Sequence, residues 1–293
     1  MVKRILFLCL LALLSGCSLL RLSYNNGPQL TWWWIDNYVG FSREHIVLAK
    51  QAIHEWFDWH RDTQLLRYAD WLAVVREQAD GIVSPDQVCQ WSDEFQNLIA
   101  PAIDYAVQLS APMVLDFNKD QWRHIERRFA KSNDELQSDF LQPDLSDRHK
   151  TSVKRTVKRI KNLYGDISEA QRKLIETSVK VSPFNPERWL AERQRRQQVI
   201  LQIFAQLAEE RVSIEQTSIV LRNAIEHTIR SDDPTYRAYQ LEMTAFTCDF
   251  VARMHNSTDL AQRQHMHKKL KNWEDDLRVL FHERTRSVAV ETK

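Results

Sequence analysis

Two histidines and two acids lie close together between residues 54 and 60, where they could bind a metal ion. His54 and Glu55 begin the HExxH order of a zinc-protease helix, whose two histidines share one helical face. Here the second histidine is His60, which lies about 600° of helical rotation from His54 and so leaves its face. Asp58 follows His54 at helical spacing, but no third ligand is evident. We expect no metal site, and we expect His60 to be a hydrogen-bonded core residue.

A different chemistry is indicated at Cys17. Lys3 and Arg4 supply positive charge, an apolar run follows over Ile5–Leu14, and Ser15-Gly16 places small residues before the cysteine. The run is about half of the roughly 20 residues that a membrane-spanning helix needs. This order is typical of a bacterial lipoprotein signal, which is cut before a cysteine that then carries acyl chains. An ordinary secretory signal that contains a cysteine is the alternative.

Lipidation of Cys17 would attach the chain to a membrane. In enteric bacteria an aspartate after that cysteine retains lipoproteins in the inner membrane, and this chain has Ser18 there. We therefore expect anchoring in the inner leaflet of the outer membrane, with the body facing the periplasm. Residues 18–30 are expected to form a short tether with a turn signal at Asn25 to Pro28, and its full extension is about 45 Å.

Cys89 and Cys248 remain once Cys9 is removed with the signal and Cys17 is lipidated. An exported protein meets an oxidising compartment, where an even pair of cysteines favours a disulfide. Two buried thiols are the alternative. We expect the bridge, which would close a loop of about 160 residues.

Tryptophan is concentrated near the start of the chain, where six of the ten lie between residues 32 and 71. Such side chains usually fill cores, but tryptophan also prefers boundaries between apolar and wet surroundings. In a helix Trp32, Trp33 and Trp34 would point about 100° apart, so they cannot all face one core. We expect this segment to dock the chain's start onto the body or to contact a membrane or partner, with at least one tryptophan near the surface.

A basic segment covers residues 148–161, which hold seven Lys or Arg residues and no acid. In a helix Lys150, Lys154, Lys158 and Lys161 share one face. A solvated face beside neighbouring acids is the simpler interpretation. The alternative is a weak contact with anionic lipid or an acidic partner, to which each surface cation contributes about 1 kcal/mol.

Charge and glycine content limit the classes of function. Loss of residues 1–16 takes Lys3 and Arg4 from the 40 basic residues, so 38 basic residues face 39 acidic ones. This balance gives no argument for binding nucleic acid. Four glycines in the remaining chain disfavour sheets and phosphate-binding loops. We find no nucleophile elbow, P-loop, dinucleotide fingerprint or CxxC motif, and we expect no catalytic residue and no cofactor.

Apolar residues recur with a helical period along almost the whole chain. One stripe predicts a long helix over about 43–80, with a break near Asp62-Thr63. Several helix starts share a capping residue followed three positions later by glutamine. These caps are Ser84, Asn118, Ser168 and Ser213. The expected fold class is all-α, with about eight to ten helices in one multi-helix array or two packed bundles.

Proline-containing breaks punctuate the later helices, at Leu141 to Asp144, Ser182 to Pro186 and Ser231 to Pro234. The expected organisation has four parts, or three if the last two form one continuous domain. These parts are the signal at 1–16, the lipidated cysteine and tether at 17–30, an N-terminal helical region at 31–141 and a C-terminal helical region at 142–293.

Six segments together resemble an uncharacterised family of proteobacterial lipoproteins, catalogued as a domain of unknown function. They are Tyr24-Asn25, Trp32 to Tyr38, Phe57 to Arg61, Glu126 to Asn133, Ser182 to Leu190 and His255 to Thr258. The resemblance covers nearly all of the chain after the signal. It implies an envelope lipoprotein, and it carries over no activity and no site residue.

Three functions follow from these observations as expectations. The first is a non-enzymatic helical scaffold or adaptor that binds another envelope protein, because a short tether and aromatic helices accompany the anchor. The second is a carrier or chaperone for a lipid or another apolar ligand held between helices. The third is a hydrolase.

Overall fold

The computed structural model describes residues 19–210 and 212–291, and this part of the chain is helical almost throughout and holds no strand. Cys17 and the expected signal at 1–16 lie outside the described residues. The helices are α2 (Leu19–Asn25), α3 (Gly27–Val39), α4 (Arg43–Thr63), α5 (Leu65–Gln78), α6 (Pro85–Leu115), α7 (Lys119–Phe140), α8 (Leu145–Tyr164), α9 (Glu169–Val181), α10 (Pro186–Glu210), α11 (Ile214–Ile229), α12 (Pro234–Asn256) and α13 (Leu260–Glu291).

The all-α prediction is confirmed, but the described residues form twelve helices instead of eight to ten. The long stripe over 43–80 divides at Gln64 into α4 and α5, close to the expected break. Two helices also occupy the segment expected to be a tether, because α2 begins at Leu19 and α3 follows a turn at Asn26. An extended tether would leave apolar side chains in water, whereas helix α2 turns Leu20 and Tyr24 onto a core cluster formed by α5 and α13.

Helix ends follow the chemistry that the sequence indicates. Asn118, Ser168 and Ser213 each accept the backbone N–H of a glutamine three residues later, and the glutamine side chain accepts from the cap backbone in return. Ser84 accepts from the backbone N–H of Gln87 and precedes a proline in the first turn of α6. These caps satisfy amide groups that a helix start would otherwise leave without a partner.

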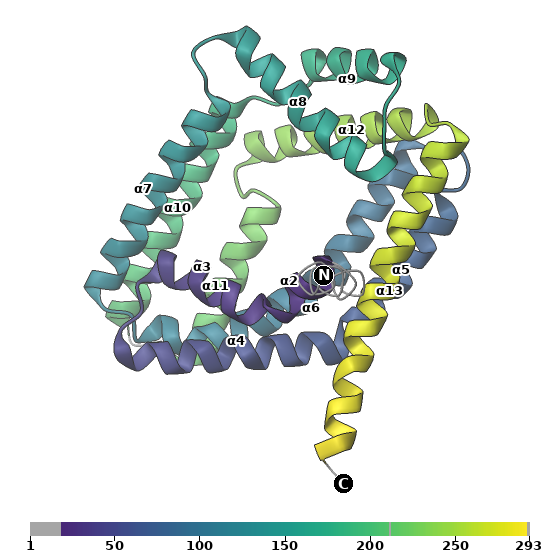
Figure 1. Ribbon diagram of the computed structural model, residues 1–293. Helices are drawn as coiled ribbons and strands as arrows, with labels where there is room; N and C mark the ends of the chain where they lie inside the picture. Colours follow the sequence, from purple (N-terminus) through teal and green to yellow (C-terminus); the bar gives the residue numbers. More distant parts are fainter. Residues whose placement is uncertain (1–18, 211, 292–293) are drawn as a thin grey trace, which may run out of the picture.

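The helices pair along the sides of a four-sided frame (Figure 1). Helix α7 lies along α10 on one side, and α5 lies along α13 on the opposite side. Helix α4 runs along a third side with α3 and part of α6, while α8, α9 and α12 occupy the fourth. Because α5, α6 and α7 each pair with helices that follow Pro143, the two expected helical regions are interleaved and do not form separate bundles.

The buried apolar side chains of the described residues form several small clusters, which lie where helices cross. One joins α5 to α13 through Leu65, Ala69, Leu277 and Leu280. Another joins α3 to α4 through Trp32, Ala49 and Ile53. A third joins α8, α9 and α12 through Val153, Ile175 and Met254. The apolar support of the frame is therefore divided among several helix contacts and is not gathered in one central core.

Helix α6 is the one described helix that is long and apolar enough, by length and composition, to cross a membrane. It contacts α4, α11 and α12 along its length, so it is also a central element of the frame. Its start is bonded covalently to α12 through Cys89.

Candidate functional site

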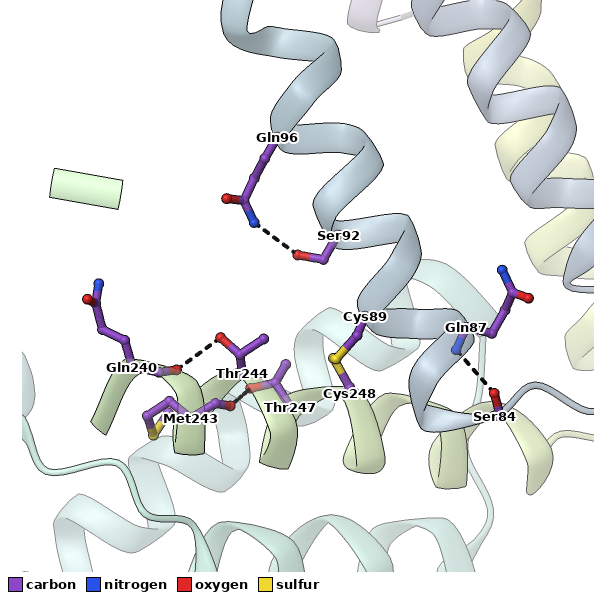
Figure 2. Close-up of a disulfide and its surroundings, with 10 residues drawn as sticks. All are labelled: Ser84, Gln87, Cys89, Ser92, Gln96, Gln240, Met243, Thr244, Thr247 and Cys248. Carbon is purple, nitrogen blue, oxygen red and sulfur yellow. Dashed lines mark hydrogen bonds between the residues drawn. A yellow bond between two sulfur atoms is a disulfide. The ribbon is translucent and has the colours of Figure 1, made fainter. Parts of the chain in front are cut away.

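The disulfide expected from the sequence is present between α6 and α12. The Sγ atoms of Cys89 and Cys248 are bonded, and the two Cα atoms are 5.5 Å apart across a sequence separation of 159 residues. Figure 2 shows the bond beside the first turns of α6, where Ser84 accepts from the amide of Gln87. The bridge therefore fixes an early helix to a late one at a corner of the frame.

Helix α2 is the described element nearest in sequence to Cys17, and it is fixed to the body by polar contacts. The guanidinium of Arg21 pairs with Asp276 of α13 at 3.2 Å. The Tyr24 hydroxyl lies 2.9 Å from Nδ1 of His60, and the Tyr24 ring meets the Phe57 ring edge-on. The start of the described chain is thus attached to both α4 and α13.

His60 is buried at the centre of this contact. Its Nε2 lies 3.2 Å from the Tyr68 hydroxyl, and its ring stacks on Trp56 at 4.5 Å between centroids. Burial lowers the pKa of His60 to about 4, so the ring is neutral at pH 7. A neutral imidazole has one donor and one acceptor nitrogen, and each tyrosine hydroxyl can either donate or accept a hydrogen bond, so both ring nitrogens can be satisfied. The prediction of a hydrogen-bonded core histidine is confirmed.

Arg61, the next residue, joins three helices. Its Nη2 donates to Oδ1 of Asn25 at 2.8 Å, and its Nη1 donates to the carbonyl oxygen of Leu280 at 3.2 Å. Its guanidinium carbon also lies 5.1 Å from the centroid of the Tyr24 ring. One side chain of α4 thereby holds the last turn of α2 and the backbone of α13. Sequence reasoning missed this role, because nothing in the local pattern distinguishes Arg61 from a surface arginine.

Helix α3 continues the docking with a close approach to α4. A Cβ atom at Gly27 would lie 2.3 Å from Cε1 of Phe57, so only glycine fits there without movement of the ring. Trp32 is 8% exposed and stacks on Phe41 with centroids 5.6 Å apart. The Nζ atom of Lys50 lies 4.9 Å above the same indole. Trp32 therefore belongs to the core that α3 shares with α4.

The other two residues of the tryptophan run point outward. Trp33 is 62% exposed and Trp34 is 63% exposed, although Trp34 keeps a contact with Tyr38 on its own helix. The prediction that at least one of the three tryptophans stays near the surface is confirmed. The segment both docks α3, through Trp32, and presents two indoles to the surroundings.

The predicted basic face is present on α8. Lys150, Lys154, Lys158 and Lys161 are all exposed, while Val153 of the same helix is buried against α9 and α12. The ends of the face are paired with acids, Lys150 with Asp147 at 3.2 Å and Lys161 with Asp166 at 2.8 Å. In the described part of the chain Lys154 and Lys158 make no ion pair. Helix α8 lies on the opposite side of the frame from α3 and α4, so the two predicted contact sites are not brought together (Figure 1).

A buried ion-pair cluster on α10 was not predicted. The carboxylate of Glu192 accepts hydrogen bonds from Arg195, Arg196 and Ser231. Burial alone would raise its pKa, yet these hydrogen bonds lower the pKa to about 2. The adjoining cavity has a volume of about 20 Å³, which is room for about one water molecule. The cluster therefore joins α10 to the turn before α12, and the spacing of Glu192 to two arginines at helical intervals is the signal that could have found it.

In residues 19–210 and 212–291, no group of three or more His, Cys, Asp or Glu side chains is placed to hold a metal ion. His54 is exposed, on a different face of α4 from the buried His60. His60 hydrogen-bonds to two tyrosine hydroxyls, and Glu192, in a separate cluster, accepts hydrogen bonds from two arginines and a serine.

Comparison with curated proteins and with solved structures gives no match. A family model does match residues 37–215, which is more than half of the 293-residue chain. The matched range begins within α3 and ends at the start of α11, so it includes α4, the first partner of the disulfide and the basic helix. The chain therefore belongs to the DUF6279 family, a family of unknown function.

Proposed function

We propose that this chain is a lipoprotein anchored through Cys17 in the inner leaflet of the outer membrane, and that its periplasmic body is a non-enzymatic scaffold or adaptor for another envelope protein. The observation that carries this proposal is the fixed attachment of α2. Its first residue is two positions after Cys17, and Arg21, Tyr24 and Arg61 hold the helix against α4 and α13. An anchor attached in this way would position the whole body relative to the membrane.

The bracing of the frame supports the same proposal. A scaffold must keep its contact surfaces in fixed relative positions, and here early helices pair with late ones while a disulfide bonds α6 to α12. Such cross-links between distant segments limit how far the sides of the frame can move independently.

The carrier alternative has less support. A lipid carrier needs an apolar cavity large enough to enclose most of an acyl chain. One hollow in the described residues has a volume of about 20 Å³ and is lined in part by Arg195, Arg196 and Asp232. A second hollow is an open depression on α7 lined by charged and polar side chains such as Lys131 and Asp134. Neither has the form of a lipid site.

The basic face of α8 is the surface that we propose for an acidic partner. Lys154 and Lys158 are exposed, and in the described residues neither has an acidic partner within the chain, so both are free to pair with carboxylates of another protein. Such exposed pairs give specificity and faster association more than affinity.

Photo-crosslinking in cells tests the adaptor proposal. A photoreactive amino acid replaces Lys154 or Lys158 on α8 and, as the control, the exposed Lys119 at the start of α7. We expect a discrete protein adduct from positions 154 and 158 that is missing from position 119. Adducts that are equal at all three positions, or that are absent from both positions on α8, would contradict a specific partner at this face.

A further inference from the structure

We propose that the outward face of α2 and α3 rests on the same bilayer that holds the lipid anchor, with its leucines and tryptophans in the boundary between headgroups and acyl chains. This inference rests on the proposed anchor at Cys17, and it adds a second contact that orients the body. The occupant of the face is the lipid surface itself.

The face is continuous on α3. Leu30, Trp33 and Trp34 stand at positions i, i+3 and i+4, which share one side of a helix. All three are exposed, whereas Trp32 and Ile35 on the other side pack into the cluster shared with α4. Large apolar side chains that share one exposed helix face mark a surface that meets a partner or a membrane.

Helix α2 extends the apolar face toward the anchor. Leu19 is 79% exposed and Leu22 is 54% exposed, while Leu20 and Tyr24 turn onto the cluster of α5 and α13. The exposed side of α2 thus carries two leucines beside the uncharged Ser23 and Asn25. Leu19, the residue of α2 nearest to Cys17, is the more exposed of the two leucines.

The charge pattern fits a lipid interface. No charged residue occurs from Leu22 to Ile35, and the charged residues at both ends of this segment are turned to the protein. Arg21 pairs with Asp276, and the carboxylate of Asp36 accepts the backbone N–H of Phe41 at 3.1 Å. This mixture of leucine and tryptophan with the uncharged polar residues Ser, Asn and Gln suits the membrane–water interface, where tryptophan concentrates in membrane proteins.

The chain between Cys17 and α2 is too short to hold the exposed face of α2 away from the membrane. Only Ser18 lies between Cys17 and Leu19, so the Cα atoms of these two residues are at most about 7 Å apart. The headgroup layer of one leaflet is itself about 5–7 Å thick, taking the difference between the whole bilayer and its hydrocarbon core. Since the acyl chains enter the hydrocarbon, the first turn of α2 must lie within or directly against the headgroups. Because α2 is fixed to the body, the exposed face cannot turn away independently.

Fluorescence quenching in vesicles tests this contact. The native Cys89 and Cys248 are bonded to each other, so a cysteine introduced at Leu30 or Trp34 is available for an environment-sensitive label. The lipidated chain is reconstituted in phosphatidylethanolamine–phosphatidylglycerol vesicles that contain a lipid spin-labelled near its carbonyl groups. The control label replaces Leu241 of α12, which is 68% exposed and belongs to the side of the frame opposite α4.

We expect a blue-shifted emission and quenching by the spin-labelled lipid at positions 30 and 34, several-fold stronger than at position 241. Replacing Trp33 and Trp34 by serine should reduce the quenching of a label at position 30, and L241S should leave it unchanged. Both tryptophans are exposed, so the double change should leave the fold intact. Equal quenching at the three labelled positions, or none at 30 and 34, would overturn the inference.

Two further readouts separate the ways in which the proposals could fail. The mass of the N-terminal peptide reports the anchor by itself. If Cys17 is acylated while labels at 30 and 34 are unquenched, the lipid contact is wrong and the lipoprotein proposal stands. If emission at position 34 shifts with protein concentration but not with spin-labelled lipid, the face contacts protein and the lipid occupant is refuted. An unmodified Cys17 would refute the anchor on which both depend.

Discussion

The disulfide between Cys89 and Cys248 should account for a large part of the stability of the frame. It closes a loop with a separation of 159 residues. In the chain-entropy model a loop of this length restricts the unfolded chain by about 5 kcal/mol, and measured values for native disulfides extend down to about 2 kcal/mol. We therefore expect the double variant C89A/C248A to lose about 2–5 kcal/mol of its free energy of unfolding.

Urea unfolding followed by circular dichroism measures this loss, with the oxidised protein as reference. Alanine at position 248 also removes a buried sulfur, which by itself costs on the order of 1 kcal/mol. Reduction of the unmodified protein breaks the cross-link without removing any atom from the core, so it isolates the effect of the bridge. Reductant should lower the unfolding midpoint of the unmodified protein and leave that of the double variant unchanged.

Two results would refute this reasoning. The first is two titratable thiols per chain in the denatured, unreduced mature protein, because the bridge would then be absent. The second is an unfolding free energy that reduction leaves unaltered, because the bridge would then not constrain the unfolded chain.

Three other predictions concern the docked helices and the basic face. Gly27→Ala should destabilise the protein by about 1–3 kcal/mol through overpacking, while Gly81→Ala, where a Cβ meets nothing within 4 Å, should change stability by less than about 0.5 kcal/mol in the same urea assay. Burial lowers the pKa of His60 to about 4, so on acidification the unfolded state binds a proton at this histidine before the folded state does. The contribution of His60 to the free energy of unfolding is therefore complete above pH 6.5 and falls by up to about 3 kcal/mol as the pH falls toward 4. H60Q should flatten this part of the plot of unfolding free energy against pH. The double change Lys154→Glu and Lys158→Glu reverses the charge at the centre of the basic face, so it should strongly reduce the protein adduct formed from a photoreactive amino acid at the exposed position 161 of the same face; an undiminished adduct would contradict an acidic partner there.

Local signals in the sequence predicted the helices and their ends well. Capping at Asn118 and Ser213, and the break near Thr63, depend on interactions within a few residues, so the sequence pattern contains them directly. An even pair of cysteines and an expected oxidising compartment predict the bond between Cys89 and Cys248, which is present.

Long-range pairing could not be predicted in the same way. Helix α2 has seven residues and is too short to be stable alone, so it forms because Leu20 and Tyr24 find partners far away in the chain. The roles of Arg61 and Glu192 also depend on which helices meet. Periodicity shows which face of a helix is buried, but it does not show against which helix, and the interleaved frame therefore appears only in the structure.

The mass of the N-terminal peptide of the chain extracted from membranes tests whether Cys17 is the lipid anchor. We expect a peptide that begins at Cys17, carries acyl chains on its sulfur and amino group, and is missing from the C17A variant, which should leave the membrane fraction. A chain that retains residues 1–16, a Cys17 without acyl chains, or a C17A variant as firmly membrane-bound as the unmodified protein would contradict it.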